Sequence, residues 1–136
     1  MNDPSAALQG AIESALVADP LVALLVAGRV YDRVPRGAAT PYVSFGPSQA
    51  LEDDADCVEG FEITQQLDVW STEPGYVQAK EVAGAVRKAL HNADLTLVGF
   101  ALNEMTVRNI RYLRDPDGLT GHAVIEVRAL LETDQP

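Results

Sequence analysis

Two stretches of this chain alternate apolar and polar side chains with a period of two, and this pattern limits the possible folds most. In residues 61–69, Phe61, Ile63, Leu67 and Val69 alternate with Glu62, Thr64, Gln66 and Asp68. In residues 121–131, Ala123, Ile125, Val127, Ala129 and Leu131 alternate with His122, Glu126 and Arg128. Successive side chains of a β-strand point to opposite faces, so each stretch predicts a strand with one dry and one wet face. An antiparallel sheet tolerates such a wet face.

Two helical regions are expected to cover the dry face. Asp-Pro pairs at residues 3–4 and 19–20 each offer a carboxylate acceptor, followed by a proline that needs no amide partner. They predict helices over residues 4–17 and 21–27. A third helix is predicted over residues 75–91, where apolar residues recur at three- and four-residue spacing opposite charged ones.

The remaining segments predict short strands and one acidic loop. The expected strands cover residues 30–34, 42–45, 96–98 and 103–113. Residues 48–60 hold five carboxylates and no base, so self-repulsion predicts a solvated, mobile loop. The predicted fold is α+β, an antiparallel sheet with helices packed on one face, in a single domain spanning residues 1–136.

Charge and hydropathy exclude several classes of protein. Among the 136 residues, 20 acids against 10 bases give a net charge of −10, which argues against a surface that grips phosphates. The most apolar run, residues 21–27, is too short to span a bilayer, so we expect a soluble, intracellular protein without a membrane partner. A single cysteine, Cys57, cannot form an internal disulfide.

No constellation of residues predicts catalysis, a metal or a cofactor. His91 and His122 have no cysteine or second histidine at metal-ligand spacing, and His91 is expected as a cation near the negative end of the third helix. Cys57 stands beside Asp56, whose charge opposes thiolate formation. Residues 115–118, Asp-Pro-Asp-Gly, resemble part of a calcium loop but fit a type I turn position by position.

Two groups of arginines leave a choice between an interface and ordinary surface charge. They are Arg29, Arg33 and Arg36 in the first, and Arg108, Arg111 and Arg114 in the second. The second group could pair with carboxylates of a partner, or could balance acidic neighbours in its own chain. For the first group, strand alternation would place Arg29 and Arg33 on one side, where an interface is plausible.

An ordered set of segments resembles a known family. The segments are GRVYDRVPRGAATPYVSF at 28–45, QLDVWS at 66–71, AKEVAGAVRKALHNADLTL at 79–97, LRDPDG at 113–118 and GHAVIEVRAL at 121–130. In this order, they resemble the tail terminator and tail completion family of long-tailed bacteriophages and gene transfer agents. The acidic content of residues 48–60 is not part of that pattern, so no role for it follows from the resemblance.

The resemblance implies a structural, ring-forming subunit without enzyme activity or cofactor. It implies a hexameric ring at the head-proximal end of the tail tube, which ends tube polymerisation and joins the tail to the head connector. The implied partners are the tail tube protein and a head-side stopper or adaptor protein, with DNA passing through the ring unbound. The implied location is a phage or gene transfer agent tail, assembled in the host cytoplasm. Alternatives are a head-side stopper or other neck protein, and less favoured, a small ligand-binding module or enzyme.

Two sets of site residues follow from this interpretation. The side chains expected to face the channel are Glu62, Gln66 and Glu126, from the wet sides of the two alternating strands. The side chains expected to contact a neighbouring ring or subunit are Glu52, Asp53, Asp54, Asp56, Arg29, Arg33, Arg108 and Arg111. For the acidic residues, a solvated loop without a partner is the alternative.

Overall fold

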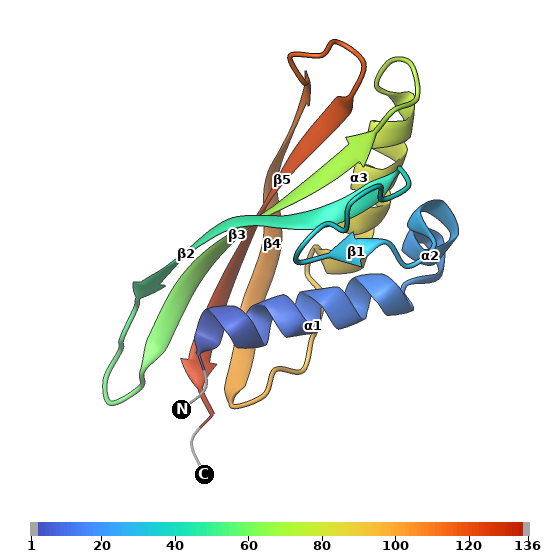
Figure 1. Cartoon of the computed structure of the whole chain (residues 1–136). Helices are drawn as coiled ribbons and strands as arrows, with labels where there is room; N and C mark the ends of the chain where they lie inside the picture. The colour runs from blue at the N-terminus through green and yellow to red at the C-terminus, as the bar shows by residue number, and fades with distance from the viewer. Residues whose placement is uncertain (1–2, 135–136) are drawn as a thin grey trace.

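The computed structural model describes residues 3–134, which form a twisted sheet with helices against it (Figure 1). The helices are α1 (Pro4–Ala18), α2 (Pro20–Val26) and α3 (Val77–Leu90). The strands are β1 (Val30–Tyr31), β2 (Tyr42–Glu52), β3 (Gly60–Ser71), β4 (Phe100–Arg114) and β5 (Gly121–Thr133). Their order in the sheet is β1-β2-β3-β5-β4.

The four long strands are antiparallel, as the alternation predicted. Gln66 of β3 lies opposite Glu126 of β5, and Glu126 lies opposite Asn109 of β4, so their side chains share one face. The short strand β1 differs from the prediction of 30–34, because only Val30 and Tyr31 pair, and they pair in parallel with β2. The sheet is therefore mostly antiparallel with one parallel edge.

All three helices pack on the dry face of the sheet, which confirms the predicted α+β fold. α1 buries Leu8, Ile12 and Leu16, and α3 buries six side chains, including Val86. These side chains join one core with the inward-facing residues of β3 and β5, among them Leu67, Ile125 and Val127. Among residues 3–134, no helix lies on the opposite face (Figure 1).

Both predicted Asp-Pro helix starts are confirmed. The Asp3 carboxylate accepts a hydrogen bond from the Ala6 amide, and the Asp19 carboxylate accepts one from the Val22 amide, each at 3.0 Å. Within residues 3–134, no single helix is long and apolar enough to cross a bilayer. α1 and α2 together meet that test by length and composition alone, but they bend by 81° where they meet.

The prediction of a loop over residues 48–60 is wrong for its first part. Residues 48–52 continue β2 past a bulge and pair with residues 61–65 of β3, so the turn covers only residues 53–59. Their side chains are all exposed, so backbone pairing rather than burial holds this part of the strand. At the tip, the Asp54 carboxylate accepts from the Gly60 amide at 3.1 Å.

Three further predictions change in their extent. Residues 96–98 form no strand, and only Leu97 makes an isolated bridge, to Phe100. β4 begins at Phe100 rather than at residue 103 and pairs with β5 along its whole length, with two bulges. α3 is confirmed, although it begins at Val77 rather than at residue 75.

The core should depend on α1 more than on the exposed corner of α2. Ile12 is fully buried, whereas the Leu24 side chain is 77% exposed. Ile12→Ala should lower the free energy of unfolding by about 2–5 kcal/mol through lost transfer energy and the cavity left behind. Leu24→Ala should change it by about 0.5 kcal/mol or less. Urea titration followed by circular dichroism measures both, and equal losses would contradict this packing.

Candidate functional site: the polar sheet face

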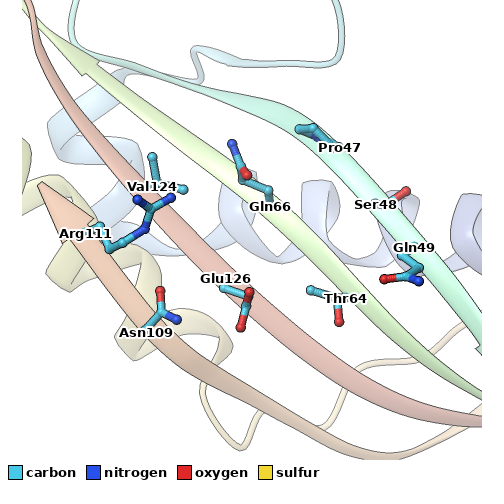
Figure 2. Close-up of a pocket in the computed structure, with 9 residues that line it drawn as sticks. All are labelled: Pro47, Ser48, Gln49, Thr64, Gln66, Asn109, Arg111, Val124 and Glu126. Atoms are coloured by element: carbon cyan, nitrogen blue, oxygen red, sulfur yellow. The ribbon is translucent and has the colours of Figure 1, made fainter. Parts of the chain in front are cut away.

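The face of the sheet opposite the helices, here called the polar sheet face, is hollowed. Figure 2 shows side chains of β2, β3, β5 and β4 on this face, with the helices behind it. The hollow has a volume of about 260 Å³ and is lined by Pro47, Ser48, Gln49, Thr64, Gln66, Asn109, Arg111, Val124 and Glu126. Its width across β2, β3, β5 and β4 makes it a concave surface rather than a pocket for a small molecule.

The residues expected to face a channel all lie on the polar sheet face. Gln66 and Glu126 line the hollow, and Glu62 lies farther along β3. Arg128 of β5 donates to the Glu62 carboxylate through Nε at 2.8 Å and also through a second guanidinium nitrogen. Its Nη1 lies 3.8 Å from the Glu104 carboxylate. Two carboxylates therefore offset the positive charge of Arg128.

The other end of the polar sheet face holds a polar cluster around His122. Its Nε2 lies 2.6 Å from an oxygen of the Asp68 carboxylate, which is itself buried. The ring stacks on Trp70 at 3.8 Å between centroids, and the Trp70 indole N–H donates to the Ser44 hydroxyl at 3.1 Å. These contacts tie β2, β3 and β5 together.

Gln65 shapes the bulge that bends β2. Its side chain points to the helix side, is 2% exposed, and donates to the carbonyls of Gly46 and Gln66 at 3.0 and 2.8 Å. A Cβ at Gly46 would lie 2.6 Å from the Asp68 carboxylate, so a side chain at this position would displace that carboxylate. Gln65 is a site residue that the apolar-polar alternation did not predict, although its polar side chain interrupts the apolar series of β3.

The second arginine group does not form one patch. Arg111 lies on the polar sheet face beside the hollow, whereas the Arg114 guanidinium stacks over the Tyr76 ring at 4.9 Å. Arg108 is exposed at the bulge between Val107 and Asn109. Within residues 3–134, neither Arg108 nor Arg111 has an ion pair or side-chain hydrogen bond. Both are therefore available to a partner.

The first arginine group includes a structural contact. The Arg29 Nε donates to the Pro41 carbonyl at 3.0 Å, which holds the loop between β1 and β2 against the start of β1. Arg33 is exposed in that loop. Contact of Arg29 and Arg33 with another subunit stays a prediction.

The acidic residues cluster at the tip of the β2–β3 hairpin. Glu52, Asp53, Asp54 and Asp56 are all exposed, and so is Cys57. Within the described residues, no three or more His, Cys, Asp or Glu side chains lie close enough to hold a metal ion. The hairpin tip is therefore an exposed concentration of negative charge.

The Asp-Pro-Asp-Gly segment forms the predicted turn between β4 and β5. The Gly118 amide donates to the Asp115 carbonyl at 2.9 Å, which closes a β-turn. The pKa of the Asp117 carboxyl is lowered because the Thr120 and Leu119 amides and then the Thr120 hydroxyl donate to it. The Asp117 oxygens thus serve the turn itself.

Two tyrosines report the partly apolar surroundings at this end of the sheet. Burial raises the pKa of Tyr42, and the negative charge of Asp115 and then Tyr31 raise it further. Burial also raises the pKa of Tyr112, whose ring lies 5.3 Å from the Lys80 ammonium.

His91 does not act as the expected helix-end cation. Its Nδ1 accepts a hydrogen bond from the Val107 amide at 3.0 Å, which requires a lone pair on that nitrogen. The ring thus satisfies a backbone amide at the β4 bulge, an arrangement that periodicity does not reveal.

A comparison with models of known protein families identifies the family of this chain. The model described as "Tail completion protein gp17" matches residues 10–132. This range covers all the helices and strands apart from the first six residues of α1 and the last residue of β5. The chain belongs to this family. Its members are structural tail completion proteins of virions and not enzymes.

Two solved structures are similar to this tail completion protein over nearly its whole length. One chain, from "Virion of native gene transfer agent (GTA) particle", is 31% identical with a TM-score of 0.90, covering 97% of this chain and 99% of its own. Another, "Structure of bacteriophage SPP1 gp17 protein", is 24% identical with a TM-score of 0.59 and shows the fold alone; the match covers 96% of this chain and 91% of that one. A comparison with curated proteins gives no match.

Loss of the His122 ring should loosen the polar end of this site. His122→Ala removes both the contact with Asp68 and the stack on Trp70, so it should lower the free energy of unfolding by about 1–3 kcal/mol. Trp70 is the only tryptophan, so native-state fluorescence should change as well. Asn109→Ala, from an exposed residue of the same face, is the control. An unchanged spectrum and stability in His122→Ala would contradict the described cluster.

Proposed function

We propose that this tail completion protein forms a hexameric ring at the head-proximal end of the tail tube. There it ends tube polymerisation and joins the tail to the head connector. The observation that carries the proposal is the division of the sheet into a helix-covered face and a concave polar face, in a chain of this family. A ring subunit needs such a division, because one face must meet an aqueous channel while the other holds the core.

The polar sheet face is the surface that lines the channel in this proposal. Glu62, Gln66 and Glu126 would face passing DNA. Carboxylates offset the Arg128 charge, which among residues 3–134 leaves Arg111 as an unpaired base on this face, where Glu62 and Glu126 also lie. Each copy carries a net charge of −10, which would repel a polyanion from the walls. DNA would therefore pass without binding.

The proposed partners lie above and below the ring. One rim would meet the tail tube protein, and the other would meet a head-side stopper or adaptor protein. A particle location agrees with the similar chain from the gene transfer agent virion. Assembly would take place in the host cytoplasm.

Copy number tests the ring. We expect six copies of this chain at the head-proximal end of each tail, the number that the resemblance to the tail terminator family implies for a closed ring. Electron cryomicroscopy of assembled particles, with subunits counted in the ring that fits this fold, gives the number. One or twelve copies per particle would contradict the proposal.

DNA binding and DNA passage test whether the polar sheet face points toward the channel. The protein should show no measurable affinity for duplex DNA near physiological salt. A Gln66→Lys and Glu126→Lys double variant should acquire salt-sensitive affinity and slow DNA passage, since both side chains would line the channel. The matched control is Glu13→Lys with Glu81→Lys, at two exposed helix positions. The control raises the net charge of the chain at least as much as the channel variant does. Fluorescence anisotropy measures affinity, and DNA delivery by particles measures passage. Equal loss of delivery in both double variants would contradict a channel-lining sheet.

A further inference from the structure

We propose that neighbouring copies in the ring join by antiparallel strand pairing between residues 48–52 of β2 in one copy and residues 110–114 of β4 in the next. The proposal rests on the ring proposed above and names the surface that closes it. It makes the sheets of successive copies one continuous wall.

Only half of the outer edge of β2 is covered in the subunit. β1 pairs with Val43 and Ser44 alone, at the beginning of β2. After the bulge, residues 48–52 pair with β3 on one side, and within residues 3–134 no backbone group bonds to their other side. An edge left open in this way is a template for another strand.

The outer edge of β4 is covered in its first half instead. The Asn92 amide donates to the Met105 carbonyl at 2.8 Å, and His91 Nδ1 accepts from the Val107 amide at 3.0 Å. Beyond the bulge, residues 110–114 bond to β5, and the described chain supplies no other backbone partner. Each edge therefore has one open stretch of five residues.

Strand direction and side-chain alternation allow these two stretches to pair. β2, β3, β5 and β4 alternate in direction, so β4 of one copy and β2 of a copy related by rotation are antiparallel. Pairing the open stretches places Gln49 opposite Leu113 and Leu51 opposite Arg111. All four belong to the polar sheet face, because Gln49 and Leu51 lie opposite Thr64 and Glu62, while Leu113 and Arg111 lie opposite His122 and Val124. The wet face thus continues from copy to copy.

Charge favours the same register. It places Asp53 of one copy opposite Asn109 of the next, diagonal to Arg111 on the polar sheet face. It places Glu52, which lies on the helix side, opposite Ile110 and two residues from Arg108. These two carboxylates make no side-chain hydrogen bond or ion pair within residues 3–134, nor do the two guanidinium groups. Opposite charges across antiparallel strands contribute about 0.2–1 kcal/mol per pair.

The register also gives a strand tilt that a closed sheet needs. In one copy Gln49 is level with Thr106, so pairing with Leu113 moves the next copy along by about six strand residues once the bulge is discounted, or about 20 Å. Four strands span about 19 Å across the sheet. The resulting tilt is about 45°, at the upper end of the range for closed sheets.

Engineered disulfides test this register. In a Cys57→Ser background, Gln49→Cys with Leu113→Cys should give, under mild oxidation of concentrated protein, a ladder of linked chains that ends at six. The matched control is Gln49→Cys with Thr106→Cys, the pair that would meet if neighbouring sheets were level. Inside one copy, the two cysteines of either pair lie on strands that are three strand spacings apart. These spacings add up to about 14 Å, which is too far for a disulfide. No ladder with Leu113→Cys, or an equal ladder with Thr106→Cys, would overturn the pairing.

Charge-reversal variants give a second test of the edge pairing that needs no engineered cysteine. Arg108→Glu with Arg111→Glu, and separately Glu52→Lys with Asp53→Lys, should each lower self-association about tenfold. Mixed in equal amounts they should associate again, because each open edge then meets the opposite charge in alternating copies. Light scattering measures this, and failure of the mixture to recover would count against the pairing.

The outcomes separate this inference from the ring itself. A ring of six copies without the Gln49–Leu113 link would remove the edge pairing and leave the ring. A linked ladder that continues past six chains without closing would keep the edge pairing and contradict the ring.

Discussion

The structure depends on the burial of only one face of its sheet. Leu67, Ile125 and Val127 are fully buried on that face, and every helix sends its apolar stripe to the same side. Burial of apolar surface is the dominant favourable term in folding. Because the other face of the sheet is polar, covering it with helices would gain little of this free energy. Polar side chains are then left as a wet, concave surface, and this is the surface that we propose lines the channel.

Sequence reasoning succeeded where the physical signal is local. The carboxylates of Asp3 and Asp19 accept from backbone amides three residues ahead, so the helix starts were readable from two residues each. The strands β3 and β5 were readable because burial of one face imposes a period of two. The placement of Glu62, Gln66 and Glu126 on one face followed from that period and from the observed register.

The features that sequence reasoning missed depend on partners far away in the chain. Residues 48–52 bury no side chain, so their strand shows no periodicity and exists only because β3 pairs with it. Asp68 and His122 are 54 positions apart and meet only through the β3–β5 register. The Arg108, Arg111 and Arg114 group was read as one cluster, but a bulge and strand alternation send its members to different surroundings. Bulges therefore limited the prediction of the site more than composition did.

The central claim, that the polar sheet face lines a channel, is tested most directly by the orientation of this subunit in an assembled particle. An electron cryomicroscopy reconstruction of the tail end, at a resolution that separates strands from helices, measures it. The account predicts that Gln66 and Glu126 point toward the tube axis while α1 and α3 lie on the outside. A ring in which α1 and α3 face the axis and the polar sheet face points outward would contradict it.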